Sequence, residues 1–321
     1  MVSFLDPAIL FFVFGMLAGV VRSNLEIPAP ISRFLSLYLL MALGLKGGFA
    51  LAKSGLTAEV VVSLALALLL ACAIPLVGYL ILRRLVNGFD AAAVAATYGS
   101  VSAVTFITAV QHLDTQGMAY GGHMAAAMAL MESPAIVMAV VLANWVRTRN
   151  APAAAAGHGS LRHVLHESLT DGAQLLLLGA MAIGMLSGAS GEAVMKPFSV
   201  DLFKGMLAFF LLDMGLQAAR NLGGLRGKSP WLLLYAVAGP LSHAGLALLL
   251  AWALGLSAGN AALLMVLAAS ASYIAVPAVV RQAIPEANPS LYFGMSLGLT
   301  FPLNIVLGIP LYASVAQRVL G

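Results

Sequence analysis

The chain has 321 residues, of which 61% are hydrophobic and 9% are charged, with a formal net charge of +4. Soluble globular proteins hold about 25% charged residues, so this composition excludes a soluble enzyme, a disordered chain and a disulfide-stapled scaffold. The single cysteine, Cys72, lies in an apolar run and can form no intrachain disulfide. Because a membrane-spanning helix needs about 20 apolar residues, the sequence predicts an all-α polytopic membrane protein of roughly ten helices.

Ten apolar segments follow one another along the chain and are separated by short polar turns. They cover residues 7–21, 34–52, 58–82, 91–111, 118–146, 168–188, 202–219, 231–255, 259–280 and 291–317. One longer connection, at 148–166, is rich in alanine and contains three histidines. It separates the first five segments from the last five.

Lys and Arg residues are unequally divided between the two sides of these segments, five on one side and eleven on the other. Because basic residues gather on cytoplasmic loops, the richer side is predicted to face the cytoplasm. Ten spans then return both termini to the outside of the cytoplasmic (inner) membrane. The same rule explains the positive net charge, and no basic and aromatic patch of the kind that binds nucleic acid occurs.

Short motifs of the first half recur in the second half, in the same order and with a nearly constant shift. The three pairs are Leu40–Lys46 with Leu211–Gln217, Gly99–Ser102 with Ala269–Ser272, and Met131–Pro134 with Leu299–Pro302. Each repeat would hold five helices, an odd number, so the second copy must be inverted relative to the first. We therefore predict a 5+5 inverted repeat, typical of secondary transporters. Its parts are residues 1–147, a cytoplasmic loop at 148–166, and residues 167–321.

The fourth and ninth segments contain matching clusters of small and hydroxyl-bearing residues, Thr97–Thr105 and Ser270–Pro277. Glycine and proline permit a helix to break, and hydroxyls satisfy the backbone groups that a break frees. Two half-helices with facing N-termini would point free N–H groups and positive dipole ends at a small anion. The alternative is that these small residues merely let helices pack closely.

Ionisable residues within spans are costly and usually functional. Glu132 lies within the fifth segment, where we expect a cation ligand or a partner of a helix break. Asn304 and Thr300, near Pro302, are expected either to cap a distorted tenth helix or to line the site.

Lys46 and Asp213 lie in the repeat-equivalent second and seventh segments, and Gln217 is the repeat counterpart of Lys46. We expect these three to make polar contacts between helices. Lys46 and Asp213 would bond each other or face a cavity, and the alternative for Lys46 is to extend its ammonium to the membrane surface.

Motifs of soluble catalysis are missing from the sequence: there is no nucleotide-binding loop, hydrolase elbow or zinc-protease helix. The histidines His158, His163 and His166 lack the ligand spacing of a zinc site. We therefore predict no enzyme and no cofactor, with transport driven by an ion gradient.

Four stretches form a recognisable pattern: Leu43–Gly48, Tyr98–Ser102, Met131–Ala135 and Ile284–Ser290. With them the chain resembles, over nearly its whole length, the sodium-dependent bicarbonate transporter family best known from cyanobacteria. The resemblance implies core and gate domains, two discontinuous helices, a homotrimer, and inward movement of bicarbonate coupled to sodium.

The resemblance also implies a site between the two broken helices. The residues expected at the substrate are Gly99, Ser100, Ser102, Ser270, Ala271 and Ser272. Those expected at the sodium ion are Thr105, Glu132, Ser102, Ser272 and Asn304.

Two departures from the family pattern concern coupling and control. Tyr273 stands where the family has an aspartate after the second hydroxyl cluster, and the loss of a carboxylate there bears on the coupling ion and the anion. The loop at 148–166 is shorter than in the cyanobacterial members that a PII-like signalling protein controls, which argues against such control here.

We therefore expect a secondary active transporter that imports bicarbonate with sodium by alternating access. Within the same class, the alternative is a sodium- or proton-coupled carrier of another small organic anion, and Tyr273 keeps it open. From a different class, the alternative is a membrane sensor or scaffold that transports nothing and binds a partner through the loop at 148–166.

Overall fold

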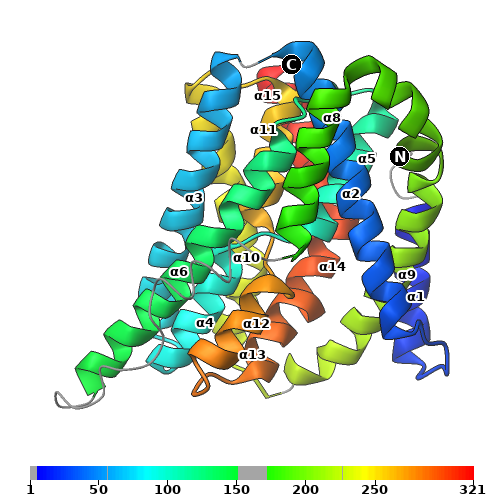
Figure 1. The fold of residues 1–321 in the computed structure, drawn as a ribbon. Helices are drawn as coiled ribbons and strands as arrows, with labels where there is room; N and C mark the ends of the chain where they lie inside the picture. The colour runs from blue at the N-terminus through cyan, green and yellow to red at the C-terminus, as the bar shows by residue number, and fades with distance from the viewer. Residues whose placement is uncertain (1–5, 56, 151–171, 226) are drawn as a thin grey trace.

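The computed structural model describes residues 6–55, 57–150, 172–225 and 227–321, which form helices joined by short connections (Figure 1). Within these ranges, seven helical runs are long and apolar enough to cross a membrane. Two shorter apolar helices accompany them, Pro7–Val20 and Ala258–Ala269. The chain is thus a multi-pass, all-α membrane protein.

The first half of the chain, as far as it is described, folds into helices that follow the predicted segments closely. They are α1 (Pro7–Val20), α2 (Ala29–Ser54), α3 (Ala58–Leu82), α4 (Gly88–Gly99), α5 (Ala103–Gln116) and α6 (Met124–Asn150). Polar side chains cap the N-termini of several of these helices. Asp6 accepts a hydrogen bond from the backbone N–H of Ala8, and Asn87 accepts from those of Phe89 and Asp90, which satisfies N–H groups that have no partner within the helix.

The second half, as far as it is described, folds into more irregular helices. They are α8 (Gly172–Lys196), η2 (Pro197–Asp201), α9 (Phe203–Asn221), η3 (Leu222–Leu225), α10 (Pro230–Ala253), α11 (Ala258–Ala269), α12 (Ala275–Ala283), α13 (Pro289–Phe293), η4 (Gly294–Thr300), α14 (Phe301–Leu303), η5 (Asn304–Gly308) and α15 (Ile309–Leu320). The last segment alternates α-helical and π-helical turns. It is therefore distorted, as expected near Pro302.

The ten predicted segments correspond to only seven helical runs that are long enough to span a membrane, because some segments are short or interrupted and two are joined. The first segment forms only the 14 residues of α1. The ninth is divided between α11 and α12, and the sixth and seventh are joined by the helical turn η2 into one run, Gly172–Leu225. The predicted loop at 148–166, with His158, His163 and His166, lies outside the described residues apart from the last helical turn of α6.

Four helices pair by close backbone contact, α1 with α9 and α2 with α8. In the first pair, a Cβ atom added to Gly15 would meet the carbonyl of Leu212. In the second, one added to Gly48 would meet the carbonyl of Met181 and lie 2.9 Å from Cα of Gly184. Small residues that let helix backbones touch are a common means of helix association in membranes. We call α1, α2, α8 and α9 the paired helices.

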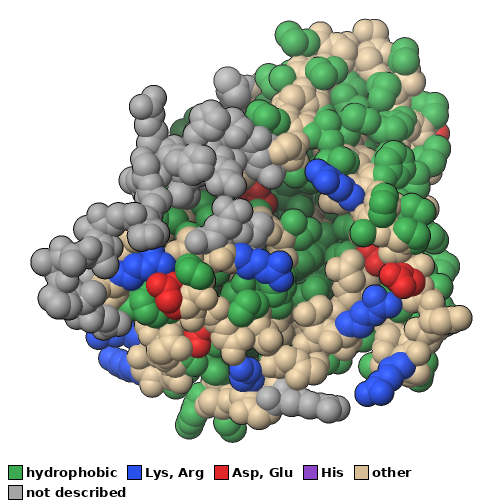
Figure 2. Space-filling model, turned by 60° about the horizontal axis from the view of Figure 1, so that its bottom comes forward, with side chains coloured by type: hydrophobic (Ala, Val, Ile, Leu, Met, Phe, Trp, Pro, Cys, Tyr) green, Lys and Arg blue, Asp and Glu red, His purple; other side chains and the backbone are tan. Residues whose placement is uncertain are grey.

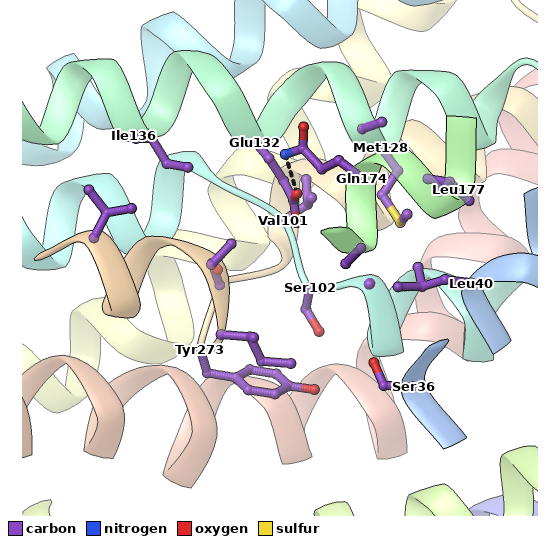
Figure 3. Close-up of a pocket in the computed structure, with 17 residues that line it drawn as sticks. Ser36, Leu40, Val101, Ser102, Met128, Glu132, Ile136, Gln174, Leu177 and Tyr273 are labelled. Atoms are coloured by element: carbon purple, nitrogen blue, oxygen red, sulfur yellow. Dashed lines mark hydrogen bonds between the residues drawn. The ribbon is translucent and has the colours of Figure 1, made fainter. Parts of the chain in front are cut away.

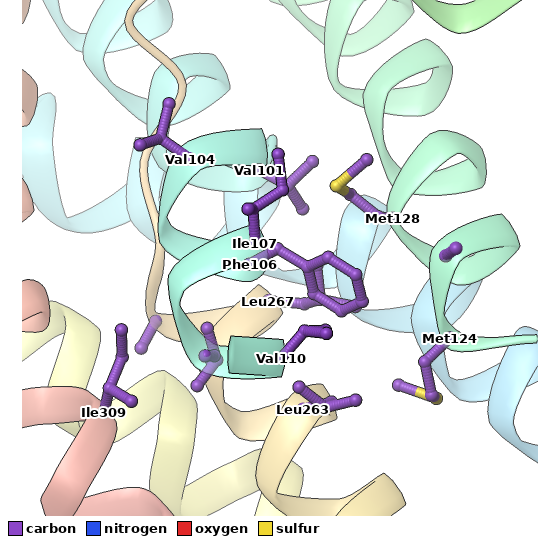
Figure 4. Packing of buried hydrophobic residues seen from close by; sticks show 14 of the residues in the cluster. Val101, Val104, Phe106, Ile107, Val110, Met124, Met128, Leu263, Leu267 and Ile309 are labelled. Carbon is purple, nitrogen blue, oxygen red and sulfur yellow. The ribbon is translucent and has the colours of Figure 1, made fainter. Parts of the chain in front are cut away.

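The remaining helices, α3–α6 and α10–α15, form a second group that we call the central helices. The strongest contacts in this group join α3 to α4 and α6, α10 to α11, and α11 to α15. Helices α4 and α11 are deeply enclosed, with every residue of Ala91–Gly99 and of Gly259–Ala269 buried. Figure 4 shows part of this packing, where Phe106 and Val110 of α5 lie near Leu263 and Leu267 of α11.

Two interruptions of the helices meet inside the central group. α4 ends at Gly99 and α5 begins at Ala103, while α11 ends at Ala269 and α12 begins at Ala275. The two breaks are bonded to each other: the Ser272 N–H donates to the Thr97 carbonyl at 2.8 Å, and the Ser102 N–H donates to Ser270 Oγ at 3.1 Å. Both predicted clusters therefore interrupt helices, and the interruptions lie side by side.

Candidate functional site

A cavity of about 220 Å³ lies where the two breaks face α2, α6 and α8 (Figure 3). We call it the central cavity. Its lining is Ser36 and Leu40 of α2; Val101, Ser102 and Ala103 at the first break; Met128, Ala129, Glu132 and Ile136 of α6; Ala173, Gln174 and Leu177 of α8; and Ser272, Tyr273, Ile274, Ala275 and Val279 at the second break. Both helix groups thus contribute to its walls.

At each break, a serine that faces this cavity accepts a hydrogen bond from the first turn of the helix that follows. Ser102 is the N-cap of α5, and its Oγ accepts hydrogen bonds from the N–H and hydroxyl of Thr105 at 3.2 and 2.9 Å. Ser272 Oγ accepts from the Val276 N–H, at 3.3 Å, in the first turn of α12. Since Ala103 and Ala275, the first residues of the two helices, also line the cavity, two positive helix ends lie at its edge.

Glu132 is the acidic residue of the central cavity, and it is half-buried. Its Oε2 accepts a hydrogen bond from Nε2 of Gln174, which lies in the first turn of α8 (Figure 3). This contact links a central helix to a paired helix across the cavity. A half-buried carboxylate that faces a cavity within a membrane span can bind a cation or a proton.

Tyr273 fills one wall of the cavity from the second break. Its ring packs against Phe301, with 5.2 Å between ring centroids, and its hydroxyl lies 3.6 Å from the sulfur of Met214 on α9. Figure 3 shows this hydroxyl pointing toward Ser36, with Ser102 beside it. The second break therefore presents a phenol, and no carboxylate, at this position of the cavity lining.

Four of the predicted substrate residues support the breaks and do not line the cavity. A Cβ atom on Gly99 would lie 2.6 Å from the ring of Pro75, so this glycine permits close packing against α3. Ser270 Oγ donates to the Leu267 carbonyl at 2.9 Å, and Ala271 is buried among apolar side chains. The Ser100 hydroxyl is buried and has no hydrogen-bond partner among the described residues.

Asn304 and Thr300 make structural contacts in the last segment. Asn304 Nδ2 donates to the Ala269 carbonyl at the end of α11, at 2.8 Å, and its Oδ1 accepts from Tyr312 at 3.0 Å. Thr300 donates to the Ala236 carbonyl. Neither residue lines the central cavity, and their hydrogen bonds reach α11 and α10 instead of capping the tenth segment.

Lys46 and Asp213 do not bond each other, and of the two expected alternatives Lys46 takes the other, because it lines a cavity next to the connection from α5 to α6. Lys46 forms an ion pair with Asp114 of α5, with 2.7 Å between Nζ and Oδ2. Asp213 is buried in the first pair of helices, and it accepts hydrogen bonds from Ser32 and, at 2.9 Å, from Gln217. Asp213 and Gln217 bind each other along α9 because they lie one helical turn apart.

Sequence reasoning did not identify Ser36 and Gln174 as residues of the cavity. Ser36 lies within an apolar helix, and Gln174 opens one, so a polar residue in an apolar run was the only signal. Their partners lie far away in the sequence, as the separation of Glu132 and Gln174 illustrates. Among the described residues, no cluster of three His, Cys, Asp or Glu side chains could hold a metal ion.

Comparison with known proteins identifies a family whose model matches this chain. A model of the Na+-dependent bicarbonate transporter superfamily matches residues 7–317 of the chain. A search of curated proteins found no match. The family model covers nearly the whole sequence, both helix breaks and every residue of the central cavity. The chain therefore belongs to the Na+-dependent bicarbonate transporter superfamily.

Proposed function

We propose that this protein imports bicarbonate together with sodium across the cytoplasmic membrane, and that the central cavity is the transport site. One observation carries the proposal: two helix N-termini, each with a serine hydroxyl bonded to its first turn, border a single cavity between the paired and the central helices. Helix N-termini bind small anions because their N–H groups lack partners and their dipole is positive.

The anion would be held by neutral donors. Ser102, Ser272 and Tyr273 present hydroxyls at the cavity, and the first turns of α5 and α12 add backbone N–H groups. Bicarbonate is a planar oxyanion that both accepts and donates hydrogen bonds, so hydroxyls suit it well. A site without a lysine or arginine in its lining also releases the anion readily, which a carrier must do.

Sodium is a hard cation and takes oxygen ligands, as other hard cations do. We propose that it binds next to the anion, with oxygens from Ser102, Ser272, Thr105 and Glu132. The buried Ser100 hydroxyl, which has no partner among the described residues, is a further ligand because a cation there would satisfy its lone pairs. In Asn304 the amide is already bonded to Ala269 and Tyr312, so we leave it out of the ligand set.

Alternating access is the mechanism we propose, with the paired helices as the gate domain and the central helices as the core domain of a 5+5 inverted repeat. The contacts support this view, because exchanging the two halves turns the pair α1 and α9 into the pair α2 and α8. The same exchange turns the pair α3 and α4 into the pair α10 and α11. Rocking of one domain against the other would then expose the site to each side in turn.

Uptake into proteoliposomes tests the proposal. With an inward sodium gradient, purified protein should accumulate labelled bicarbonate. Ser102→Ala and Ser272→Ala should each lower uptake roughly tenfold, the cost of about 1.4 kcal/mol for a lost hydrogen bond to a charged group. Ser296→Ala is the matched control, since that buried hydroxyl bonds within its own helix to the Tyr292 carbonyl. Unchanged uptake in both cavity variants would refute the site.

A second candidate function is transport of a small organic carboxylate. It is favoured by the apolar part of the central cavity, where Leu40, Val101, Ile136, Leu177 and Val279 could contact a carbon chain. The same proteoliposomes decide the question. Sodium-driven bicarbonate uptake that resists an excess of acetate, pyruvate and succinate supports bicarbonate, and strong inhibition by one of them supports the organic anion.

A further inference from the structure

A second cavity, of about 400 Å³, lies between α2 and the connection from α5 to α6. We call it the upper cavity, because it lies on the side of the molecule predicted to face outside. Its charged lining consists of Lys46, Lys53, Asp114 and Glu192. Each lysine is paired with a carboxylate: Lys46 with Asp114 at 2.7 Å, and Lys53 with Glu192 at 2.6 Å.

The Lys46–Asp114 pair is the more enclosed of the two. Its side chains are 22% and 33% exposed, against 61% and 40% for Lys53 and Glu192. The other carboxylate oxygen of Asp114 accepts a hydrogen bond from the Tyr120 hydroxyl at 2.8 Å. The ammonium of Lys46 also lies 5.2 Å from the ring centre of Phe203 at the start of α9, within the range of a cation–π contact.

Next to this ion pair, the backbone of α2 touches the connection from α5 to α6. A Cβ atom on Gly47 would lie 2.9 Å from the Gly122 carbonyl, and one on Gly122 would meet the Gly47 carbonyl and lie 2.9 Å from Cβ of Ala50. Glycine at both positions therefore brings the two backbones together. On α2, the ion pair and the contact involve the adjacent residues Lys46 and Gly47. In the connection, Gly122 lies two residues after Tyr120, which donates to Asp114.

The two partners of this contact belong to different helix groups. On one side, α2 is held to α8 by the contact of Gly48 with Met181 and Gly184. On the other side, the connection is held to the central helices, because the Gly121 N–H donates to Asn260 Oδ1 at 2.7 Å. Asn260 in turn donates to Glu59 at the start of α3, at 2.9 Å. The contact thus joins the paired helices to the central helices.

Only a thin apolar layer separates the upper cavity from the central cavity. Leu43, Phe106, Val110 and Met124 line the upper cavity, and Leu40, Val101 and Met128 line the central one. Figure 4 shows Phe106 of α5 lying near Met128 and Met124 of α6. Movement of α2 away from α5 would remove one wall of this layer, because Leu40 and Leu43 are neighbours on α2.

We propose that Lys46 and Gly47 of α2, together with Asp114, Tyr120 and Gly122, form the outer gate of the transport path, which is closed in this structure. The inference rests on the proposed function, since it assigns one of the two gates that alternating access needs. The gate is polar at its surface and apolar beneath, so water can enter it when the ion pair separates. The Tyr120 hydroxyl stabilises the closed form by its bond to Asp114.

The Tyr120 hydroxyl stays a donor over the whole physiological range. Burial raises the pKa of this phenol, and the adjacent Asp114 carboxylate raises it further. Its O–H therefore donates to one carboxylate oxygen of Asp114 while the other oxygen accepts from Lys46.

The test measures access to the central cavity without any substrate. Cys72→Ser removes the only cysteine of the chain, and A129C then supplies a reporter thiol in the lining of the central cavity. A membrane-impermeant maleimide is applied to vesicles from the Lys46 side. Asp114→Asn should speed labelling roughly fivefold, the upper value for a partly exposed ion pair. The charge exchange K46D/D114K should restore slow labelling.

Gly47→Ala provides a second variant that leaves all charges in place. Its Cβ atom would push against the Gly122 carbonyl, so we expect faster labelling from the Lys46 side and slower labelling from the opposite side. Each protein is compared at equal monodispersity in size-exclusion chromatography. Labelling rates that match the parent in Asp114→Asn, Lys46→Met and Gly47→Ala would overturn the gate. Absence of bicarbonate uptake with altered labelling would instead refute the proposed function and leave the gate standing.

Discussion

At the scale of single residues, the two helix breaks depend on contacts that have no charge. Ser102 caps the start of α5, Ser272 bonds to the first turn of α12, Ser270 closes the end of α11, and Asn304 binds the last carbonyl of that helix. An unsatisfied polar group in a membrane costs several kcal/mol. Each break is stable because its freed backbone groups find partners of this kind, and only the Ser100 hydroxyl, among the described residues of the two clusters, keeps a buried oxygen without one.

A substitution at Gly99 would test how closely the first break packs against Pro75 of α3. In Gly99→Ala the new methyl group would lie 2.6 Å from the Pro75 ring, and we expect a loss of about 1–3 kcal/mol in stability together with lower uptake. Thermal unfolding in detergent measures the first effect. Pro75→Ala should make room for the methyl group, so the double variant should recover part of the lost stability. A double variant no more stable than Gly99→Ala would show that the two residues do not oppose each other.

The sequence located the breaks but not the partners of single side chains. The clusters at 97–105 and 270–277 contain glycine, proline and hydroxyls in apolar runs. This local pattern can be recognised without knowledge of the fold. Lys46 and Asp114 are 68 positions apart, and Glu132 and Gln174 are 42 apart. Such pairs follow from how whole helices pack, which local pattern does not contain. Lys46 was therefore expected to bond Asp213 or to face a cavity, and its actual partner, Asp114, was not predicted.

At the scale of helices, glycine determines which elements can move together. The backbone contacts of α1 with α9 and of α2 with α8 leave no space for side chains between them, so each pair is expected to move as one unit. By contrast, α2 meets the central helices through an ion pair and a small backbone contact. The weaker junction is therefore the one expected to open.

Gly48→Ala should separate the second pair. A methyl group there would press on the Met181 carbonyl and on Gly184, and we expect a destabilisation of about 1–3 kcal/mol. Gly179→Ala is the control on the same pair, because nothing lies within 4 Å of the added atom and alanine favours helix over glycine. Thermal unfolding midpoints in one detergent compare the two. Equal midpoints for Gly48→Ala and the unchanged protein would contradict the close pairing.

The helix boundaries show which helix ends hydropathy predicts correctly and which it does not. The segment predicted at 58–82 agrees with α3 at both ends, since polar residues flank it on each side. The segment predicted at 34–52 starts five residues too late, because α2 begins at Ala29, directly after Pro28, and Arg33 already lies inside the helix. A charged residue at a helix start is exposed there, so hydropathy alone places the boundary too far inward.

At the scale of the whole molecule, basic residues predict how the chain lies in the membrane. Figure 2 shows many Lys and Arg side chains on the face that carries the lower ends of the helices in Figure 1. The C-terminal end of the chain and the start of α11 lie at the opposite face (Figure 1). Because basic loops stay in the cytoplasm, we expect the face in Figure 2 to be cytoplasmic.

Reporter fusions after Gly321 test this orientation. Alkaline phosphatase folds only outside the cytoplasm, so a fusion there should be active, whereas green fluorescent protein exported in the unfolded state should stay dark. Fusions that end after Arg84, in the predicted cytoplasmic turn between α3 and α4, should give the reverse. Fluorescence at Gly321 with an inactive phosphatase would invert the topology, and the upper cavity would then open to the cytoplasm.

The pairing of α1 with α9 also determines the order in which the protein can be built. Gly15 contacts the carbonyl of Leu212, which is synthesised about 200 residues later. At about 5–20 residues per second, α1 waits roughly 10–40 s in the membrane for its partner. During that time a helix of 14 residues, with its glycine face uncovered, must be retained by the insertion machinery or by lipid. Synthesis of the first half alone would therefore yield a precursor that cannot mature.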